Sequence, residues 1–106
     1  MIYEVRFSRR SHADLISIYE YVSAKSDSSR ALAYFERIRD YCLMLNRFPQ
    51  RGTSYDYVLQ GVRVVGFERR VSIAFRIKGQ TIEIVRVMYG GRNVEKHLKA
   101  GRRGEG

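Results

Sequence analysis

Arginines dominate the residues of this chain whose chemistry could serve a function. There are 16 Arg and 4 Lys in the sequence. Arg carries a rigid planar fork that binds phosphate or carboxylate through two parallel hydrogen bonds, whereas solubility needs only charge. We therefore expect several arginines to gather in one basic patch that binds a target or an anion. The candidate residues for this patch are Arg63, Arg70, Arg76, Arg86, Tyr89 and Arg92.

The positive charge is unevenly distributed along the chain. Residues 1–46 hold 7 Lys/Arg and 6 Asp/Glu, whereas residues 47–106 hold 13 and 5. This asymmetry indicates an anionic partner, either nucleic acid or an acidic protein, for the C-terminal half. The final stretch could be a docking surface, an active-site rim or a solubilising tail. We expect a docking surface up to Leu98 and a tail beyond Gly101.

Four further features bear on chemistry. Tyr89 is expected either to stack on a base or on a partner side chain, or to cap the core. His97 is either a solvated histidine or a general acid. Cys42 lies on the apolar stripe of a predicted helix, so we expect it to pack in the core. No His, Cys or acidic pair has metal-ligand spacing, and Gly90-Gly91 is too short for a phosphate loop. We therefore expect no metal and no cofactor.

The length and composition indicate one domain. We expect a single domain over residues 1–100 and a flexible tail over residues 101–106. A lone cysteine argues for a reducing compartment. No apolar run approaches the roughly 20 residues that cross a bilayer, and the charged N-terminus does not resemble a signal peptide. We expect a cytoplasmic protein without membrane contact.

The hydrophobic pattern predicts helices and strands in a definite order. Alternation with period two marks strands, and apolar residues at i, i+3 and i+4 mark helices. Ser8 stands at a helix N-cap, and Pro49 requires the second helix to end before it. The predicted segments are strand 2–7, helix 9–24, a second helix between the 25–29 turn and residue 49, strands 62–67, 70–78 and 80–89, and a short helix over 92–99.

These segments predict an α+β fold with the order β-α-α-β-β-β. The two helices form a hairpin packed on one face of a mostly antiparallel sheet. In strand 70–78, Val71, Ile73 and Phe75 share the face that we expect against the helices. The other face is expected to be open and to carry arginines. Strand 80–89 carries apolar residues on both of its faces, as a central strand should.

Four segments, taken in order, resemble a known family. Arg9, Val62 and Tyr89 stand where that family often has Pro, Leu and His. Over residues 3–98 the chain resembles the ParE-type toxins of the ParE/RelE superfamily of bacterial toxin–antitoxin modules. The segments that carry the resemblance are FSRRSHADLISIYEYV with its Ala13-Asp14-Leu15, RFPQRG, GVRVVGF and IEIVRVMYGGRN.

The resemblance implies a toxin that is neutralised by a partner protein. ParE-like members inhibit DNA gyrase by binding, and RelE-like members cleave mRNA on the ribosome. The partners implied are a cognate acidic, ParD-like antitoxin in a hetero-oligomer, and DNA gyrase, alone or beside its DNA. The antitoxin is expected to be partly disordered and to fold across the toxin surface.

The sequence favours gyrase inhibition over cleavage of mRNA. RelE-like enzymes use an Arg at the position of Ser72 and often a Tyr at the position of Leu98. We therefore expect inhibition by binding, without turnover. If the protein is an enzyme, it is an endoribonuclease in which neighbouring groups replace the missing ones. The residues available for that role are Arg70, Tyr89, Arg92 and His97.

Overall fold

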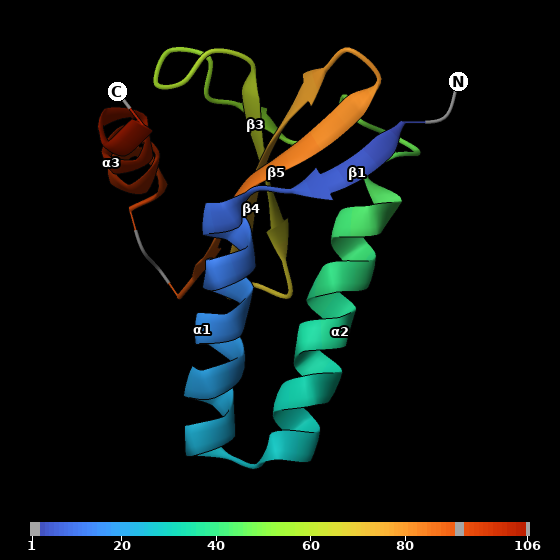
Figure 1. Cartoon of the computed structure of the whole chain (residues 1–106), viewed down its shortest axis with the longest axis vertical. Helices are drawn as coiled ribbons and strands as arrows, with labels where there is room; N and C mark the ends of the chain where they lie inside the picture. Colours follow the sequence, from blue (N-terminus) through green and yellow to red (C-terminus); the bar gives the residue numbers. More distant parts are fainter. Residues whose placement is uncertain (1–2, 91–92, 106) are drawn as a thin grey trace.

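A five-stranded sheet with a helical hairpin on one face forms the body of the protein (Figure 1). The computed structural model describes residues 3–90 and 93–105, with side chains described up to residue 99. The predicted α+β class and the helical hairpin are confirmed. The elements are β1 (Glu4–Phe7), α1 (Arg9–Lys25), α2 (Ser28–Met44), β2 (Thr53–Ser54), β3 (Val62–Phe67), β4 (Val71–Lys78), β5 (Thr81–Tyr89) and α3 (Val94–Glu105).

The sheet is mixed, with the strand order β1-β5-β4-β3-β2. The first strand, β1, pairs parallel with β5, and every other pair is antiparallel. The predicted central position of the last long strand is confirmed, because β5 lies between β1 and β4. The long connection from β1 to β5 allows this parallel pair, since parallel strands cannot be joined by a tight turn.

Capping residues fix the start of each helix of the hairpin. The predicted N-cap is confirmed, since the Ser8 hydroxyl accepts a hydrogen bond from the Ser11 amide at 3.0 Å. Asp27 caps α2 in the same way through the Arg30 amide at 2.8 Å. The helix α2 ends at Met44, before Pro49, as the sequence predicts.

The main core lies between the helical hairpin and the sheet. Val71, Ile73 and Phe75 of β4 face it, as predicted, and each is at most 2% exposed. From the helices the core receives Ile18, Ile38 and other apolar side chains at helical spacing. The alternation along β4 and the helical spacing in α1 and α2 therefore identify the same buried layer between the helices and the sheet.

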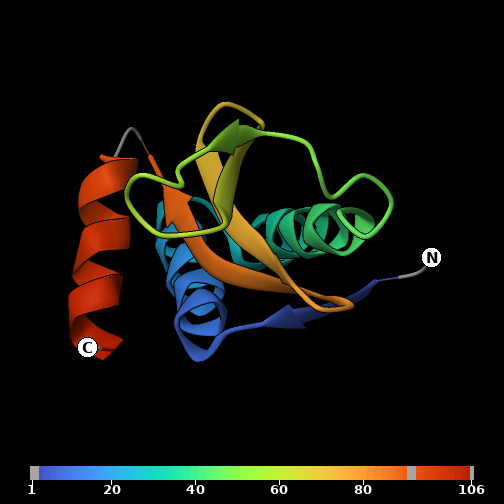
Figure 2. The same ribbon diagram turned by 90° about the horizontal axis from the view of Figure 1, so that it is seen from above.

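The second face of the sheet is not open, and that prediction is wrong for its centre. Ala74 of β4 is 0% exposed and belongs to a second, smaller core, formed by Val58, Val62, Ala74, Met88 and Leu98. The 55–61 loop and α3 pack there beside the small Ala74 side chain, through Val58 and Leu98. Figure 2 shows the course of this loop and of α3 from above. The helix α3 also runs to Glu105, beyond the end near residue 99 that the sequence predicts.

Candidate functional site

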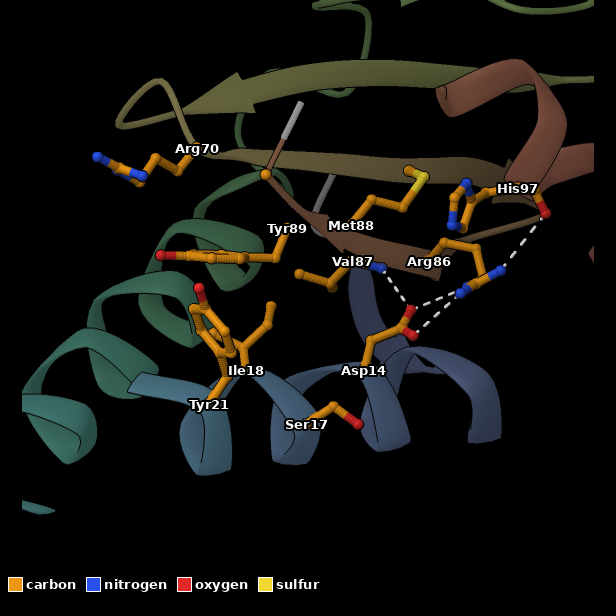
Figure 3. A pocket seen from close by; sticks show the side chains of 11 residues that line it. Asp14, Ser17, Ile18, Tyr21, Arg70, Arg86, Val87, Met88, Tyr89 and His97 are labelled. Carbon is orange, nitrogen blue, oxygen red and sulfur yellow. Dashed lines mark hydrogen bonds and ion pairs between the residues drawn. The ribbon is translucent and has the colours of Figure 1, made fainter. Parts of the chain in front are cut away.

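The residues that the sequence predicts as one patch line two separate grooves. Arg70, Arg86, Tyr89 and His97 line the larger groove, whose volume is about 670 Å³ (Figure 3). Arg63 and Arg76 line the smaller groove, whose volume is about 270 Å³. The predicted Arg92 lies outside the described residues. The single patch of the prediction is therefore split between two places.

One wall of the larger groove is α1, which follows β1 directly and lies along the edge of β5. At the end of β1, the Ser8 amide donates to the Ile84 carbonyl and the Ser8 hydroxyl donates to the Val85 carbonyl, both at 3.0 Å. Further along α1, Asp14 Oδ2 accepts the Val87 amide at 2.8 Å. These bonds satisfy backbone groups that a strand would otherwise pair. They hold α1 along β5 and so fix the wall of the groove.

Arg86 is held inside the protein and does not present a free charge. Its Nε and Nη2 donate to the two carboxylate oxygens of Asp14 at 2.9 and 3.1 Å, and Nη1 donates to the His97 carbonyl at 3.4 Å. Its side chain is 11% exposed. This bidentate pair links α1 and β5 to α3. The sequence reasoning missed the role of Asp14, although Asp14 stands in the Ala13-Asp14-Leu15 segment.

Arg70 is the predicted cation with an unengaged head group. Its guanidinium makes no hydrogen bond or ion pair with any residue in 3–90 or with any described side chain of α3. Its backbone is fixed instead, because the Arg70 carbonyl accepts the Gly90 amide at 2.7 Å. Figure 3 shows the side chain extending outward at one end of the groove, away from Arg86 and His97. Arg70 can therefore bind an anion without first breaking an internal contact.

A strained turn presents Arg70. Glu68 and Arg69, just before it, have φ of 48° and 67°, which is the left-handed region that side chains with a Cβ rarely adopt. The Glu68 carboxylate accepts two hydrogen bonds of 2.9 Å from Arg37 of α2. The same bonds lower the pKa of Glu68. The ion pair thus ties the turn to the helical hairpin.

Tyr21 and Tyr89 line the end of the groove nearest to Arg70, and Tyr34 packs against Tyr89. The Tyr89 ring lies 5.5 Å from the Tyr21 ring and 6.3 Å from the Tyr34 ring, centroid to centroid. Burial, followed by the neighbouring Tyr89 hydroxyl, raises the pKa of Tyr34. Tyr89 both packs against the main core and lines the groove, so its two predicted roles are compatible.

His97 faces the groove from α3. Its Nδ1 lies 2.9 Å from the Asn93 carbonyl oxygen. A carbonyl only accepts, so Nδ1 carries the proton in that contact and Nε2 is the nitrogen that a neutral ring leaves unprotonated. The ring therefore has one nitrogen free for proton transfer or for binding.

The two arginines of the smaller groove are already bound to other groups of the protein. Arg63 donates to the carbonyls of Gln50 at 2.8 Å and Arg51 at 3.0 Å. Arg76 donates to the Glu83 carboxylate across the β4–β5 pair at 2.8 Å, and each of the two side chains is 27% exposed. Both arginines therefore stabilise the fold around the groove.

Two positions that matter for RNA cleavage carry no suitable group. Leu98 is 1% exposed and belongs to the second core, so its position faces packed side chains. Ser72 lies on β4 opposite Met88 and offers a hydroxyl where a cation would be needed.

Cys42 is 0% exposed, as predicted, and burial raises its thiol pKa to about 12. It is therefore a packing residue, since the thiolate is the reactive form.

Metal-ligand clusters and membrane-spanning helices are both absent from residues 3–90 and 93–105. Within these ranges no three His, Cys, Asp or Glu side chains gather as metal ligands would. In the same part of the chain, no helix combines the length and the hydrophobicity that crossing a bilayer requires.

Comparison with known proteins identifies the family. The family model described as the ParE toxin of the type II toxin–antitoxin system parDE matches residues 5–94. The chain belongs to the ParE toxin family. A search of the curated proteins finds no match.

Solved structures of toxin–antitoxin systems share the fold of this ParE-family chain. The chromosomal ParDE system from P. aeruginosa contains a chain that is 27% identical, with a TM-score of 0.74, and the match covers 84% of this chain and 97% of that one. The RelBE2 toxin–antitoxin complex from Mycobacterium tuberculosis contains a chain that is 18% identical, with a TM-score of 0.59 and coverage of 84% and 99%. The second likeness concerns the fold alone.

Proposed function

We propose that this ParE-family toxin inhibits DNA gyrase by binding in the cytoplasm. The observation that carries the proposal is the family match over residues 5–94. The structure supplies a surface suited to docking, because the free Arg70 and the tyrosine cluster lie at one end of the larger groove. Arg and Tyr are the residue types that contribute most to binding at protein interfaces.

We also propose that a cognate acidic antitoxin neutralises the toxin. The chain carries a formal net charge of +9 at pH 7, which favours rapid association with an acidic partner. The P. aeruginosa relative comes from a ParDE toxin–antitoxin system, which supports a ParD-like partner for this chain. The complex is then a hetero-oligomer in which the antitoxin covers the toxin.

A second candidate function is ribosome-dependent cleavage of mRNA. One observation favours it, because Arg70, Tyr89 and His97 all line the larger groove and could supply a cation and a proton donor. Against it stand Ser72 and the buried Leu98, where the corresponding groups are lacking. Gyrase inhibition remains the primary proposal.

The proposal is tested by gyrase supercoiling with purified, antitoxin-free protein. Relaxed plasmid, gyrase and ATP are incubated with increasing toxin, and both lost supercoiling and trapped cleaved DNA are measured. Inhibition at amounts stoichiometric with gyrase is the expected result. Adding the cognate acidic antitoxin should restore supercoiling at an equimolar ratio.

Translation of a reporter mRNA on purified ribosomes distinguishes the second candidate. Cleaved mRNA together with normal supercoiling, from protein shown to be folded by circular dichroism, would refute gyrase inhibition. It would also establish the nuclease reading, and His97→Ala would then be the first variant to test.

A further inference from the structure

The rim of the larger groove combines a flat aromatic surface with a free cation. Figure 3 shows Arg70 on one side of the Tyr89 ring and Tyr21 on the other, and all three side chains line the groove. The Tyr89 ring packs against the rings of Tyr21 and Tyr34, with centroids 5.5 and 6.3 Å away. The ring is therefore fixed in orientation before any ligand arrives, which lowers the entropic cost of stacking on it.

The charges of the groove leave Arg70 available to an anion. Asp14 is the acidic residue among those that line the groove, and its two oxygens are bound by Arg86. Glu68, two residues before Arg70, is bound by Arg37. A phosphate that approaches Arg70 therefore meets no unpaired carboxylate from the groove lining.

We propose that this groove binds single-stranded nucleic acid, with one base stacked on Tyr89 and its phosphate paired with Arg70. An aromatic ring beside a cation is the combination with which proteins bind unpaired nucleotides without regard to sequence. The groove volume of about 670 Å³ lies within the range of about 300–1,000 Å³ typical of ligand sites. A carboxylate from a peptide could satisfy Arg70, but a nucleotide also supplies the flat ring that Tyr89 would stack on.

Tyr89 lies on the other side of the sheet from Ser72 and Leu98, the two positions at which RelE-like enzymes carry catalytic groups. Tyr89 packs against the main core, on the helical side of the sheet. Ser72 alternates with the core residues of β4 and so points to the opposite face. Leu98 belongs to the second core on that same opposite face. Binding at Tyr89 therefore needs no nuclease chemistry.

The inference rests on the proposed function for its location, since it names a ligand for the same groove. It predicts that the toxin contacts an unpaired strand while it is docked on its target. Its test uses the full chain and an oligonucleotide without gyrase, so that the two proposals can fail separately.

The experiment measures fluorescence anisotropy of labelled strands of about 12 nucleotides, a length within the usual site size. Oligothymidylate and oligouridylate are titrated with the toxin at several salt concentrations. The protein has eight Tyr and no Trp, so quenching of its intrinsic fluorescence reports stacking on tyrosine directly. Tighter binding of the DNA strand would indicate gyrase-bound DNA as the source, and tighter binding of the RNA strand would indicate mRNA.

The expected changes separate stacking from charge. Arg70→Ala should weaken binding about tenfold and should reduce the slope of log K against log salt by about 0.7, the value for one phosphate contact on a single strand. Tyr89→Leu should weaken binding about tenfold and abolish the fluorescence quenching, whereas Tyr89→Phe should retain binding within about twofold. Arg69→Ala removes the same charge from the neighbouring residue, outside the groove, and should change affinity less than twofold.

Several outcomes would overturn the inference. Binding that is equally weakened by Arg69→Ala and Arg70→Ala would show that net charge alone attracts the strand. If Arg70→Ala impairs gyrase inhibition but leaves oligonucleotide binding intact, the groove contacts protein and the inference fails while the proposed function stands. If Tyr89→Leu fails to fold, as judged by circular dichroism, Tyr21→Leu replaces it, because Tyr21 is 51% exposed and backs the Tyr89 ring.

Discussion

The two grooves contain the same kind of residue in opposite roles. In the smaller groove, Arg63 and Arg76 are bound by backbone carbonyls and by Glu83. In the larger groove, Arg86 is bound in the same internal way, but Arg70 keeps an unengaged guanidinium. The number of arginines in a sequence therefore does not measure the charge available to a partner. Availability depends on which carboxylates and carbonyls the fold brings beside each one.

The largest expected effect concerns the arginine that is bound inside the larger groove. Asp14→Ala leaves the Arg86 guanidinium, 11% exposed, without its carboxylate and also removes the acceptor of the Val87 amide. An uncompensated charge at a mostly buried site should lower the free energy of unfolding by about 3 kcal/mol. Urea denaturation followed by circular dichroism measures it. Asp14→Asn, which keeps an acceptor for Val87, is the matched control and should lose less; a loss below about 1 kcal/mol for Asp14→Ala would contradict the internal role.

A smaller effect separates Arg70 from Arg76. Arg70→Ala should weaken gyrase inhibition about tenfold, which corresponds to about 1.4 kcal/mol, and should leave stability within about 0.5 kcal/mol of wild type. Arg76→Ala should do the reverse, with a stability loss of about 0.7 kcal/mol for the cross-strand pair and unchanged inhibition. Supercoiling and urea denaturation of both variants provide the measurements. Equal loss of inhibition in the two variants would remove the distinction between the grooves.

The smallest effect concerns the ion pair that holds the turn before Arg70. Arg37 lowers the pKa of Glu68 in the folded protein, so the unfolded chain binds more protons around that pKa. The stabilisation is complete above the unfolded value of about 4.3 and is lost as the pH falls through the folded pKa. Glu68→Gln should therefore cost about 0.5 kcal/mol at pH 7, as an exposed pair does, and less at a pH of about 3. Thermal unfolding at the two pH values checks this, and a constant difference would point to the strained turn instead of the charge.

The sequence predicts the backbone of the fold well because its signals are local. Alternation of Val71, Ile73 and Phe75 identifies the buried face of β4, and Ser8 identifies the start of α1. Such patterns depend only on the repeat of a strand or a helix. The two-residue strand β2 is missed, since its pairing with β3 leaves no periodic signal in so short a segment.

The candidate site is predicted less well because it depends on contacts between distant segments. Of the six residues predicted for target binding, four arginines lie in the described grooves: Arg63, Arg70, Arg76 and Arg86. The sequence gives no sign of which of them are bound to other groups of the protein. Asp14 and Arg86 are 72 residues apart, and Arg37 and Glu68 are 31 apart. Whether two charges meet across such separations depends on the packing of α1 and α2 against the sheet.

By itself, the sequence determined the α+β order of elements, the main core and the family, because hydrophobic period, caps and ordered segments are readable along the chain. Only the tertiary structure decided that the second face carries its own core and that Arg70 alone among the described candidate arginines has an unengaged head group. The physical reason is that burial and ion pairing depend on distances in space, and the sequence records only distances along the chain.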